Sequence, residues 1–337
     1  MPNTKITVIG GGTGTIAVLQ KLKDYPHLDI SVIVSMTDDG GSNAVIRDEF
    51  GLLPLSDLRK SIIALSEIED GVLREMFTYR FNKGEGLSGH TLGNLMMTAL
   101  THITGSEVQA IAAAKTLFRV KGEVIPVTLQ NTKLVALYED GNIVLGEHLI
   151  DEPHECSNPC RIQELKLSKN VVANPEAIKA LREADVIIAG PGDLYTTTLA
   201  NVIIPGISQA IVENAGTFIF INNLMTKFGQ TSGMKASDLV SEITKYAHRA
   251  PDVVFVHEGI LPQKSVEKYA EAKEFPIEDD LVSTAAYKVV RSNFIKDIEE
   301  AKETGDKLRR SLIRHDSEKL SKALYAVIQA SILTTAK

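Results

Sequence analysis

Glycines concentrated near the start of the chain are the residues best suited to hold a ligand. Four of the five residues from Gly10 to Gly14 are glycine, and Thr13 is the exception. Residues 6–9 before them have the apolar, β-branched character of a buried strand, and a helical pattern begins near Thr15. Glycine lets backbone N–H groups approach an anion closely, and a helix start adds the positive end of its dipole. The run predicts a phosphate-binding site at Gly10, Gly11, Gly12, Thr13 and Gly14. The alternative is a tight turn without a ligand.

The glycine run fits neither of two common phosphate-binding motifs. No Lys-Ser or Lys-Thr pair follows it, so it is not a P-loop. Val18 stands where a dinucleotide fingerprint needs a small residue, and a start at Gly11 puts Gly14 one place early. A nicotinamide-dependent oxidoreductase is therefore disfavoured.

Two adjacent carboxylates, Asp38 and Asp39, follow the next predicted strand, residues 30–36. A strand, a helix and a second strand within about 30 residues form a βαβ unit, so both strand ends should lie at one edge of a parallel sheet. Neighbouring side chains in an extended segment point in different directions. One carboxylate can then bind a ribose or a metal ion while the other caps a turn; alternatively, both only cap turns.

Polar side chains further along extend this candidate site. Ser42 follows the two carboxylates. Arg47 and Arg59 are each candidates to pair with a phosphate or with a carboxylate, and are otherwise solvated surface arginines. His90 and Asn94 fall on one face of a predicted helix at i, i+4, where His90 either contacts a ligand or serves as a cap or core residue.

A second glycine turn ends a later strand, residues 184–189. Gly190 and Gly192 flank a proline there, which stiffens the turn, and the N–H groups of Asp193 and Leu194 are available to a ligand. The alternative is a rigid connection with no ligand. Asn223 follows the strand predicted at residues 217–221, so several strand ends carry glycine, aspartate or asparagine.

The elements that must position these residues follow from hydrophobic periodicity. We expect an α/β, Rossmann-like three-layer fold with a mostly parallel sheet, in one domain over residues 1–337, with a small β-rich subdomain inserted at residues 123–168. Helices are predicted at residues 16–22, 56–66, about 86–103, 106–118, 175–183, 264–272 and 318–333. Further strands are predicted at 124–128, 134–138, 143–145, 162–167 and 253–257, with an acidic loop or edge strand at 276–281.

Composition limits the classes of function. The chain has 337 residues, 44% hydrophobic and 23% charged, with a net charge of −7 and no basic block, which argues against a nucleic-acid partner. No apolar run is long enough for a spanning helix, so we expect no membrane insertion and a cytoplasmic location. We also expect a homo-oligomer.

The two cysteines, Cys156 and Cys160, are half of a zinc site at most. No second cluster of Cys or His would complete four ligands, and Pro159 opposes a helix that would align the pair. A polar loop insertion is the better interpretation.

Taken together, these motifs resemble those of the CofD and YvcK superfamily. The resemblance covers nearly the whole chain, and it rests on the order of eight motifs that are individually weak. The YvcK branch, the gluconeogenesis factors, is the closer one, because the Asp-Asp-Gly-Gly-Ser and Arg-His-Asp segments are features of that branch. In chain order the motifs are GGGTG at Gly10 to Gly14, DDGGS at Asp38 to Ser42, R-x-E/D-x-G-x-L-P at Arg47 to Pro54, D-x-R at Asp57 to Arg59, GH-x-x-GN at Gly89 to Asn94, GPG-x-LYT at Gly190 to Thr196, N-x-MT at Asn223 to Thr226 and RHD at Arg314 to Asp316.

The resemblance implies a Rossmann-like fold that binds a nucleotide or nucleotide sugar. The YvcK branch is associated with UDP-sugars, cell shape and growth on gluconeogenic carbon. The CofD branch transfers a phospholactyl group from a guanosine diphosphate donor to a deazaflavin, with Mg²⁺. By position, the diphosphate would lie among Gly11, Gly12, Thr13, Gly14, Gly192 and Leu194. Asp38 and Asp39 would be the catalytic pair and would hold the acceptor or the metal. Asn223 would contact the nucleotide. Arg314 and the hydroxyl of Tyr269 would each pair with a phosphate.

Three positions depart from the pattern that the resemblance implies. Leu55-Ser56-Asp57 stands where Pro-Gly-Asp is usual, Asp193 where Ser is usual, and Lys227 where Gln is usual. Asp193 matters most, because a carboxylate repels a diphosphate unless a cation intervenes.

Two functions remain open from the sequence. The first is a cytoplasmic nucleotide-sugar binding protein that links carbon metabolism to cell shape and envelope growth through a protein partner. This function is favoured because many strands end in residues suited to ligand binding, while no nucleophile or general base is evident. The second is a CofD-like transferase of a phosphorus-containing group, which uses Mg²⁺. The low aromatic content, 5%, offers little for stacking a deazaflavin.

Overall fold

A parallel sheet forms the centre of the molecule in the computed structural model, which describes residues 3–68, 71–153, 161–283, 286–296 and 312–335. Within those residues seven strands pair in the order β10-β9-β8-β7-β1-β2-β3, and every pair is parallel. The expected α/β, Rossmann-like fold is confirmed. The strands are β1 (Thr4–Gly10), β2 (Leu28–Val34), β3 (Glu123–Pro126), β7 (Val186–Ala189), β8 (Thr217–Ile221), β9 (Val253–His257) and β10 (Lys288–Ser292).

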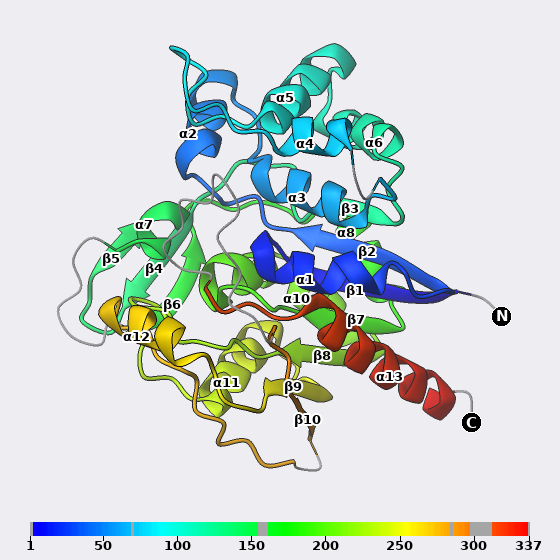
Figure 1. The fold of residues 1–337 in the computed structure, drawn as a ribbon, viewed down its shortest axis with the longest axis vertical. Coiled ribbons are helices and arrows are strands. Elements are labelled where there is room, and N and C mark those ends of the chain that lie inside the picture. Colours follow the sequence, from blue (N-terminus) through cyan, green and yellow to red (C-terminus); the bar gives the residue numbers. More distant parts are fainter. Residues whose placement is uncertain (1–2, 69–70, 154–160, 284–285, 297–311, 336–337) are drawn as a thin grey trace.

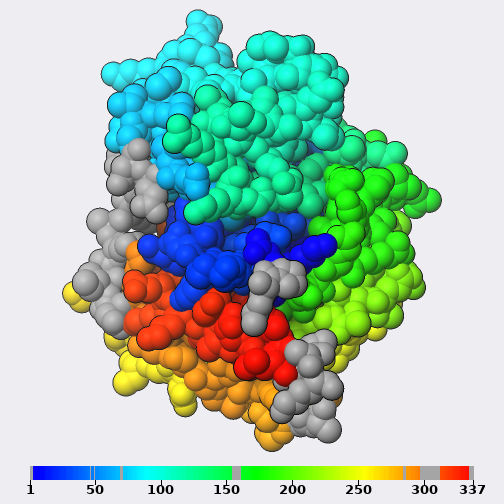
Figure 2. Space-filling model, turned by 90° about the vertical axis from the view of Figure 1, so that its right-hand side faces the viewer, coloured from blue at the N-terminus to red at the C-terminus, as the bar shows by residue number. Residues whose placement is uncertain are grey.

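The central strands are buried on both faces, which explains their continuous apolar sequences. All four residues of β7 are buried, as are the last five of β1. On one face of the sheet α1 (Gly12–Leu22) packs against α3 (Ser56–Leu65) and α13 (Ser317–Thr335). Figure 2 shows the red α13 against the blue start of the chain. The other face carries α8 (Pro175–Arg182), α10 (Ile207–Glu213) and α11 (Ala236–Ala247).

The chain reverses its direction of winding between β1 and β7. From β1 the sheet extends through β2 to β3, and from β7 it extends the other way through β8 and β9. In open α/β sheets ligands bind outside the carboxyl ends of the strands at such a switch point. The glycine turns that follow β1 and β7 therefore both lie at this switch point, outside the carboxyl ends of neighbouring strands.

A small antiparallel sheet is inserted beside the carboxyl edge of the large one. It consists of β4 (Leu134–Tyr138), β5 (Ile143–Leu145) and β6 (Ile162–Leu167), with the short helix α7 (Glu147–Asp151) between β5 and β6. In Figure 1 the arrow of β2 points toward the side where this insert lies. The insert was expected to begin at residue 123, and that boundary is wrong, because β3 pairs with β2 in the large sheet.

Figure 1 shows further helices near the β3 side of the sheet, namely α2 (Gly41–Phe50), α4 (Val72–Thr78), α5 (Leu92–Thr104) and α6 (Glu107–Leu117). The helix expected from about residue 86 starts at Leu92, because the Thr91 side chain accepts a hydrogen bond from the Asn94 N–H and caps it. The sequence pattern had not indicated α2, α7 or β10, and residues 276–281 form no strand.

The remaining elements complete the far half of the chain. A π-helical turn at Leu194–Leu199 leads into α9 (Ala200–Val202), and α12 (Gln263–Glu271) follows β9. Asp316 accepts hydrogen bonds from the N–H groups of Glu318 and Lys319 (2.9 Å each) and so caps α13. No helix in the described ranges is both long and apolar enough to cross a bilayer. Cys156 and Cys160 lie outside the described residues.

Candidate functional site

The two glycine turns touch each other at the switch point. A Cβ atom on Gly14 would lie 2.4 Å from the carbonyl oxygen of Pro191, a distance that side chains do not reach, so only glycine fits there. Asn223, after β8, donates a hydrogen bond from Nδ2 to the carbonyl oxygen of Gly192 (2.7 Å). Three predicted binding segments, after β1, β7 and β8, are thus brought together.

Gly12 opens α1 with a backbone that favours glycine. Its φ is 65°, and nothing lies within 4 Å of where a Cβ would stand. The first N–H groups of α1 have no partner within the helix, so the turn has the donors that an anion needs.

A lysine that the motifs did not single out stands beside the first turn. A Cβ on Gly11 would lie 2.5 Å from Oδ2 of Asp57, at the start of α3. The other oxygen of Asp57 accepts from the Lys60 ammonium (2.9 Å), and the Asp57 charge raises the pKa of Lys60. An i, i+3 pair of this kind near the glycine run is the signal that could have found Lys60.

Asp38 is partly buried, and its carboxylate interacts with the charges of Asp57 and Lys60 in α3. Its carboxylate accepts from the Gly40 N–H (2.9 Å) and from Nδ2 of Asn43 (2.6 Å). Burial, and then the nearby Asp57 charge, raise the pKa of Asp38 above its ordinary value.

Asp39 points the other way and holds the insert. Its Oδ1 accepts from the His148 N–H in α7 (3.0 Å), and its Oδ2 lies 3.5 Å from the Lys133 ammonium. The expectation that the two neighbouring carboxylates diverge is therefore confirmed. Asp39 is engaged with α7, and Asp38 caps the turn at Gly40, as one interpretation expected of an aspartate here. Asp38 is the carboxylate whose charge interacts with Asp57, which lies against the first glycine turn.

Helix α7 adds two carboxyl groups that the sequence analysis missed, Glu147 and Asp151. Burial, then the charges of Asp38 and Asp151, raise the pKa of Glu147 well above its ordinary value. This interaction shows that Glu147 lies near Asp38 although 109 positions separate them. The sequence analysis predicted no helix or strand between residues 145 and 162, and no local signal connects Glu147 to Asp38.

A second lysine bridges the insert and the second glycine turn. The Lys227 ammonium donates to Asp151 of α7 and to Asp193. Burial opposes the charge of Lys227, yet the carboxylates of Asp193 and Asp151 raise its pKa above the ordinary value. Asp193 is thus accompanied by a cation.

Comparison with known proteins identifies the family. The model of the family described as 2-phospho-L-lactate transferase CofD matches residues 6–295. The chain belongs to the CofD family. A Thermotoga maritima protein is 35% identical over 94% of this chain and 97% of its own length. The Bacillus subtilis protein named "Gluconeogenesis factor" is 33% identical over 96% of this chain and 98% of its own.

A solved structure supports both the fold and the family. The crystal structure of a Bacillus halodurans protein matches with a TM-score of 0.86 and 33% identity, covering 96% of this chain and 99% of that one. Another crystal structure of a Bacillus halodurans protein, described as a member of the UPF0052 family, matches with a TM-score of 0.85. The expected membership of the CofD and YvcK superfamily is confirmed.

In this CofD-family chain the motif residues Ser42, His90, Asn94 and Arg59 form one hydrogen-bonded network. Ser42 Oγ lies 2.8 Å from His90 Nδ1 and accepts from Nδ2 of Asn94 (3.2 Å). Arg59 donates from Nε to Asn94 Oδ1 (3.1 Å), and burial lowers the pKa of Arg59 to about 10. The network joins the starts of α2 and α5 to α3.

Arg47 is also directed at protein acceptors. It donates from one terminal nitrogen to the carbonyl oxygens of Thr37 (3.2 Å) and Asp38 (3.0 Å), and from the other to Asn131 and to the carbonyl oxygen of Thr132 (2.9 Å). Neither Arg47 nor Arg59 is the solvated surface residue that one interpretation expected, since both are buried. We assign their guanidinium groups to positioning the loops rather than to a phosphate.

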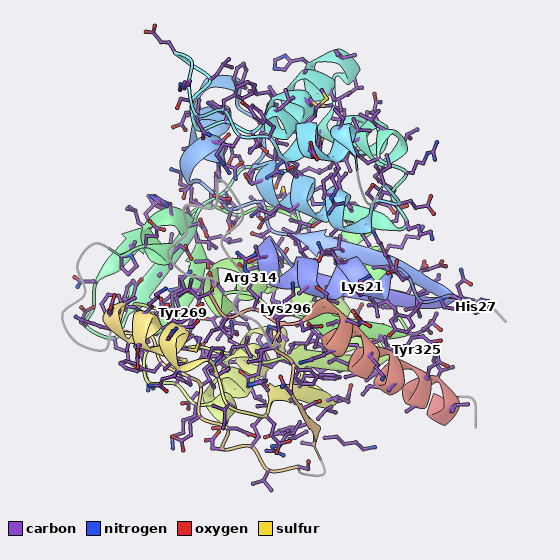
Figure 3. All side chains as sticks on the ribbon, in the orientation of Figure 1. Lys21, His27, Tyr269, Lys296, Arg314 and Tyr325 are labelled. Atoms are coloured by element: carbon purple, nitrogen blue, oxygen red, sulfur yellow. The ribbon has the colours of Figure 1, made fainter. Side chains whose placement is uncertain are left out.

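Tyr269 and Arg314 lie on the carboxyl side of the sheet (Figure 3). Tyr269, on α12, is 7% exposed, packs with Leu224 and Ile295, and accepts a hydrogen bond from the Ile313 N–H (3.5 Å). Arg314 is partly buried in the segment that leads to α13. The hydroxyl of Tyr269 thus contributes to holding the Arg314 segment in place.

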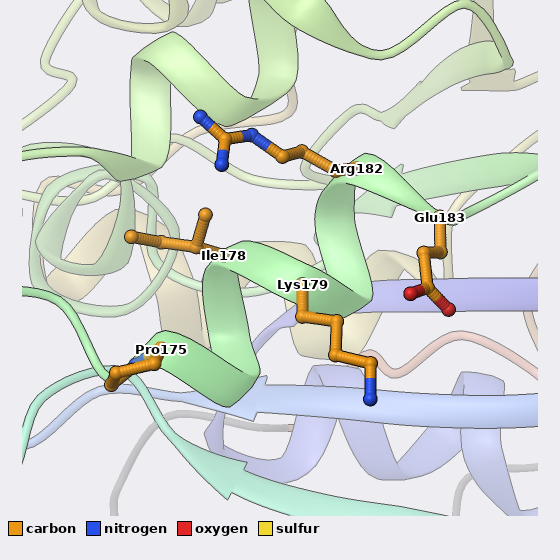
Figure 4. Close-up of a pocket in the computed structure, with 5 residues that line it drawn as sticks. All are labelled: Pro175, Ile178, Lys179, Arg182 and Glu183. Atoms are coloured by element: carbon orange, nitrogen blue, oxygen red, sulfur yellow. The ribbon is translucent and has the colours of Figure 1, made fainter.

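A pocket on α8 lies apart from this site. It is lined by Pro175, Ile178, Lys179, Arg182 and Glu183 (Figure 4). Arg182 pairs with Glu213, and Glu183 pairs with Lys5. Because none of these residues belongs to the turns after β1, β7 or β8, we assign it no part in ligand binding.

Proposed function

We propose that this chain binds a nucleotide sugar of the UDP-sugar class, with the diphosphate between the two glycine turns. The contact of Gly14 with the carbonyl of Pro191 carries the proposal, because it joins two donor-rich turns at the switch point of the sheet. Lys60 and Lys227 provide positive charge on the two sides of this point.

A divalent cation fits the charges of the site. The carboxyl groups of Asp38, Asp57, Glu147, Asp151 and Asp193 outnumber these two ammonium groups, so a diphosphate would be repelled without a further cation. No group of three or more His, Cys, Asp or Glu side chains in the described residues is arranged to hold a metal. Mg²⁺ commonly takes one or two carboxylates and the phosphates of its substrate. We assign Asp38 as the protein ligand of an ion that the nucleotide would bring with it.

Calorimetry tests the binding proposal. UDP-N-acetylglucosamine, UDP-glucose and GDP are titrated into the protein with and without Mg²⁺. Saturable heat with a UDP-sugar, strengthened by Mg²⁺, is the expected result. The absence of heat with all three nucleotides at millimolar concentration rejects the proposal.

The names of the relatives motivate a proposal for the wider role. Relatives carry the name gluconeogenesis factor, and we propose that a partner protein in the cytoplasm senses nucleotide-sugar occupancy and links carbon supply to cell shape and envelope growth. A homo-oligomer remains part of this proposal. Comparing the proteins that co-purify with wild-type chain and with a binding-deficient variant tests it, and identical partners in both samples would contradict it.

A CofD-like transfer reaction is the second candidate, favoured by the family model that matches residues 6–295. Asp38 would then face the acceptor hydroxyl and the metal, while the N–H groups of both glycine turns stabilise charge on the transferred phosphoryl group. Incubation with a deazaflavin, a guanosine diphosphate donor and Mg²⁺, analysed by mass spectrometry, tests this. A deazaflavin that carries the phospholactyl group, with GMP released from the donor, supports the transferase, and the absence of this product with binding intact supports the binding protein.

A further inference from the structure

Lys227 connects three segments that are far apart in the sequence. It lies after β8, Asp193 lies in the turn after β7, and Asp151 ends α7 of the insert. Its ammonium donates to both carboxylates. Asp151 also accepts from Oγ1 of Thr196 (3.3 Å) and from Nε2 of Gln230 (3.5 Å).

The bridge is largely shielded from water at its centre. The Lys227 side chain is 12% exposed and that of Asp151 is 19% exposed, while Asp193 is 40% exposed toward solvent. An exposed surface pair contributes little, but removing one member of a shielded pair leaves an uncompensated charge, which is costly. Lys227 is therefore far more consequential than the exposed lysines of the chain.

Asp193 precedes the N–H groups that the second glycine turn offers. Its carboxylate would repel a diphosphate bound at that turn, and Asp151 would add to the repulsion. With Lys227 in place, the three groups carry a net charge of −1, whereas without it the two carboxylates would face each other at −2.

We propose that Lys227 is a positioning residue that makes the turn at Asp193 compatible with an anionic ligand and ties α7 to that turn. The electrostatic half of this inference, the compensation of Asp193, rests on the proposed diphosphate site. The second half, the tether between α7 and the turn, does not. Since α7 carries Glu147, the same contact fixes a carboxyl group near Asp38. The Lys227 ammonium is thus one of the contacts, beside those of Asp39 and Thr196, that couple the insert to the ligand site.

A double-mutant cycle tests the electrostatic half. Lys227→Gln, Asp193→Asn and the double variant are titrated with UDP-N-acetylglucosamine and Mg²⁺. Lys227→Gln should bind at least about tenfold more weakly, whereas the double variant, which again carries −1, should bind within about threefold of wild type. Lys5→Gln, which breaks an exposed pair with Glu183, is the matched control and should bind as wild type does.

Two results would overturn this half. Unchanged affinity in Lys227→Gln would show that the ammonium does not influence the ligand. A double variant as weak as Lys227→Gln would show that the ammonium contacts the ligand directly instead of compensating Asp193. Circular dichroism and Tm are recorded for each variant, and the rescue by the second substitution separates an electrostatic effect from loss of fold.

Hydrogen exchange of the ligand-free protein tests the tether. Lys227→Gln should increase amide exchange at residues 147–151 by about tenfold or more, with no comparable change in β1 or β7. Unchanged exchange there would overturn the tether. If wild type binds no nucleotide, the proposed function fails while this second test still decides the role of Lys227 in the fold.

Discussion

The carboxylate of Asp57 lies directly against Gly11. A Cβ on Gly11 would be 2.5 Å from Oδ2, and the other carboxylate oxygen holds Lys60 at 2.9 Å. The start of α3 therefore closes one side of the first glycine turn and places an ammonium group next to it. Lys60, and neither Arg47 nor Arg59, is the basic side chain paired with Asp57 at the start of α3.

Replacement of Lys60 tests this arrangement. Lys60→Met leaves Asp57 uncompensated beside Gly11, so affinity for a UDP-sugar should fall by about tenfold or more and should depend less on salt. Isothermal titration at two salt concentrations measures both effects. Lys121→Met, which breaks an exposed pair with Glu67, serves as control, and equal affinities in the two variants would exclude Lys60 from the site.

Replacement of Gly12 tests the proposed phosphate-binding site. The φ of 65° makes Gly12→Ala cost about 1 kcal/mol of stability, but the Cβ meets no protein atom, so the fold should persist. Nucleotide binding should be abolished, because the Cβ enters the space above the turn. Gly105→Ala has a similar φ of 71° and open surroundings at the end of α5, so it should pay a similar stability cost and bind normally. Retained binding in Gly12→Ala would move the site elsewhere.

Glu147 predicts a pH dependence of stability. Its pKa is raised in the folded protein by burial and then by Asp38, so the folded state binds a proton more tightly than the unfolded state does. Stability is therefore lost as pH rises from the ordinary glutamate pKa toward the raised one. Glu147→Gln should raise Tm by about 1–2 °C at pH 7 and leave it unchanged near pH 4. Calorimetry at both pH values measures this, and a Tm that falls at pH 7 would contradict it.

Replacement of Asn94 should lower the free energy of unfolding. Asn94→Ala removes the acceptor of the Arg59 Nε–H and a donor to Ser42, both buried or partly buried, so unfolding should become easier by about 1–3 kcal/mol. Urea denaturation measures the change. Thr104→Ala, at the opposite end of α5, is a milder control. Full stability together with lost nucleotide binding would instead return Asn94 to the ligand site.

The sequence by itself determined the features that depend on neighbouring residues. The strand, glycine turn and helix at the start of the chain and the βαβ unit each follow from local spacing and hydrophobic periodicity. The order of eight short motifs also identified the family, because the family model and the relatives match most of the chain.

The tertiary structure decided the features that depend on distant pairing. β3 has the composition of the strands that follow it, yet its hydrogen bonds go to β2, so it belongs to the large sheet and not to the insert. The roles of Asp38 and Asp39 can be distinguished only in the folded structure, because α7 donates a hydrogen bond to Asp39. Asp193 looked unfavourable for a diphosphate in the sequence, and its partner Lys227 stands 34 positions away. Charge compensation acts through space, so only the fold could show it.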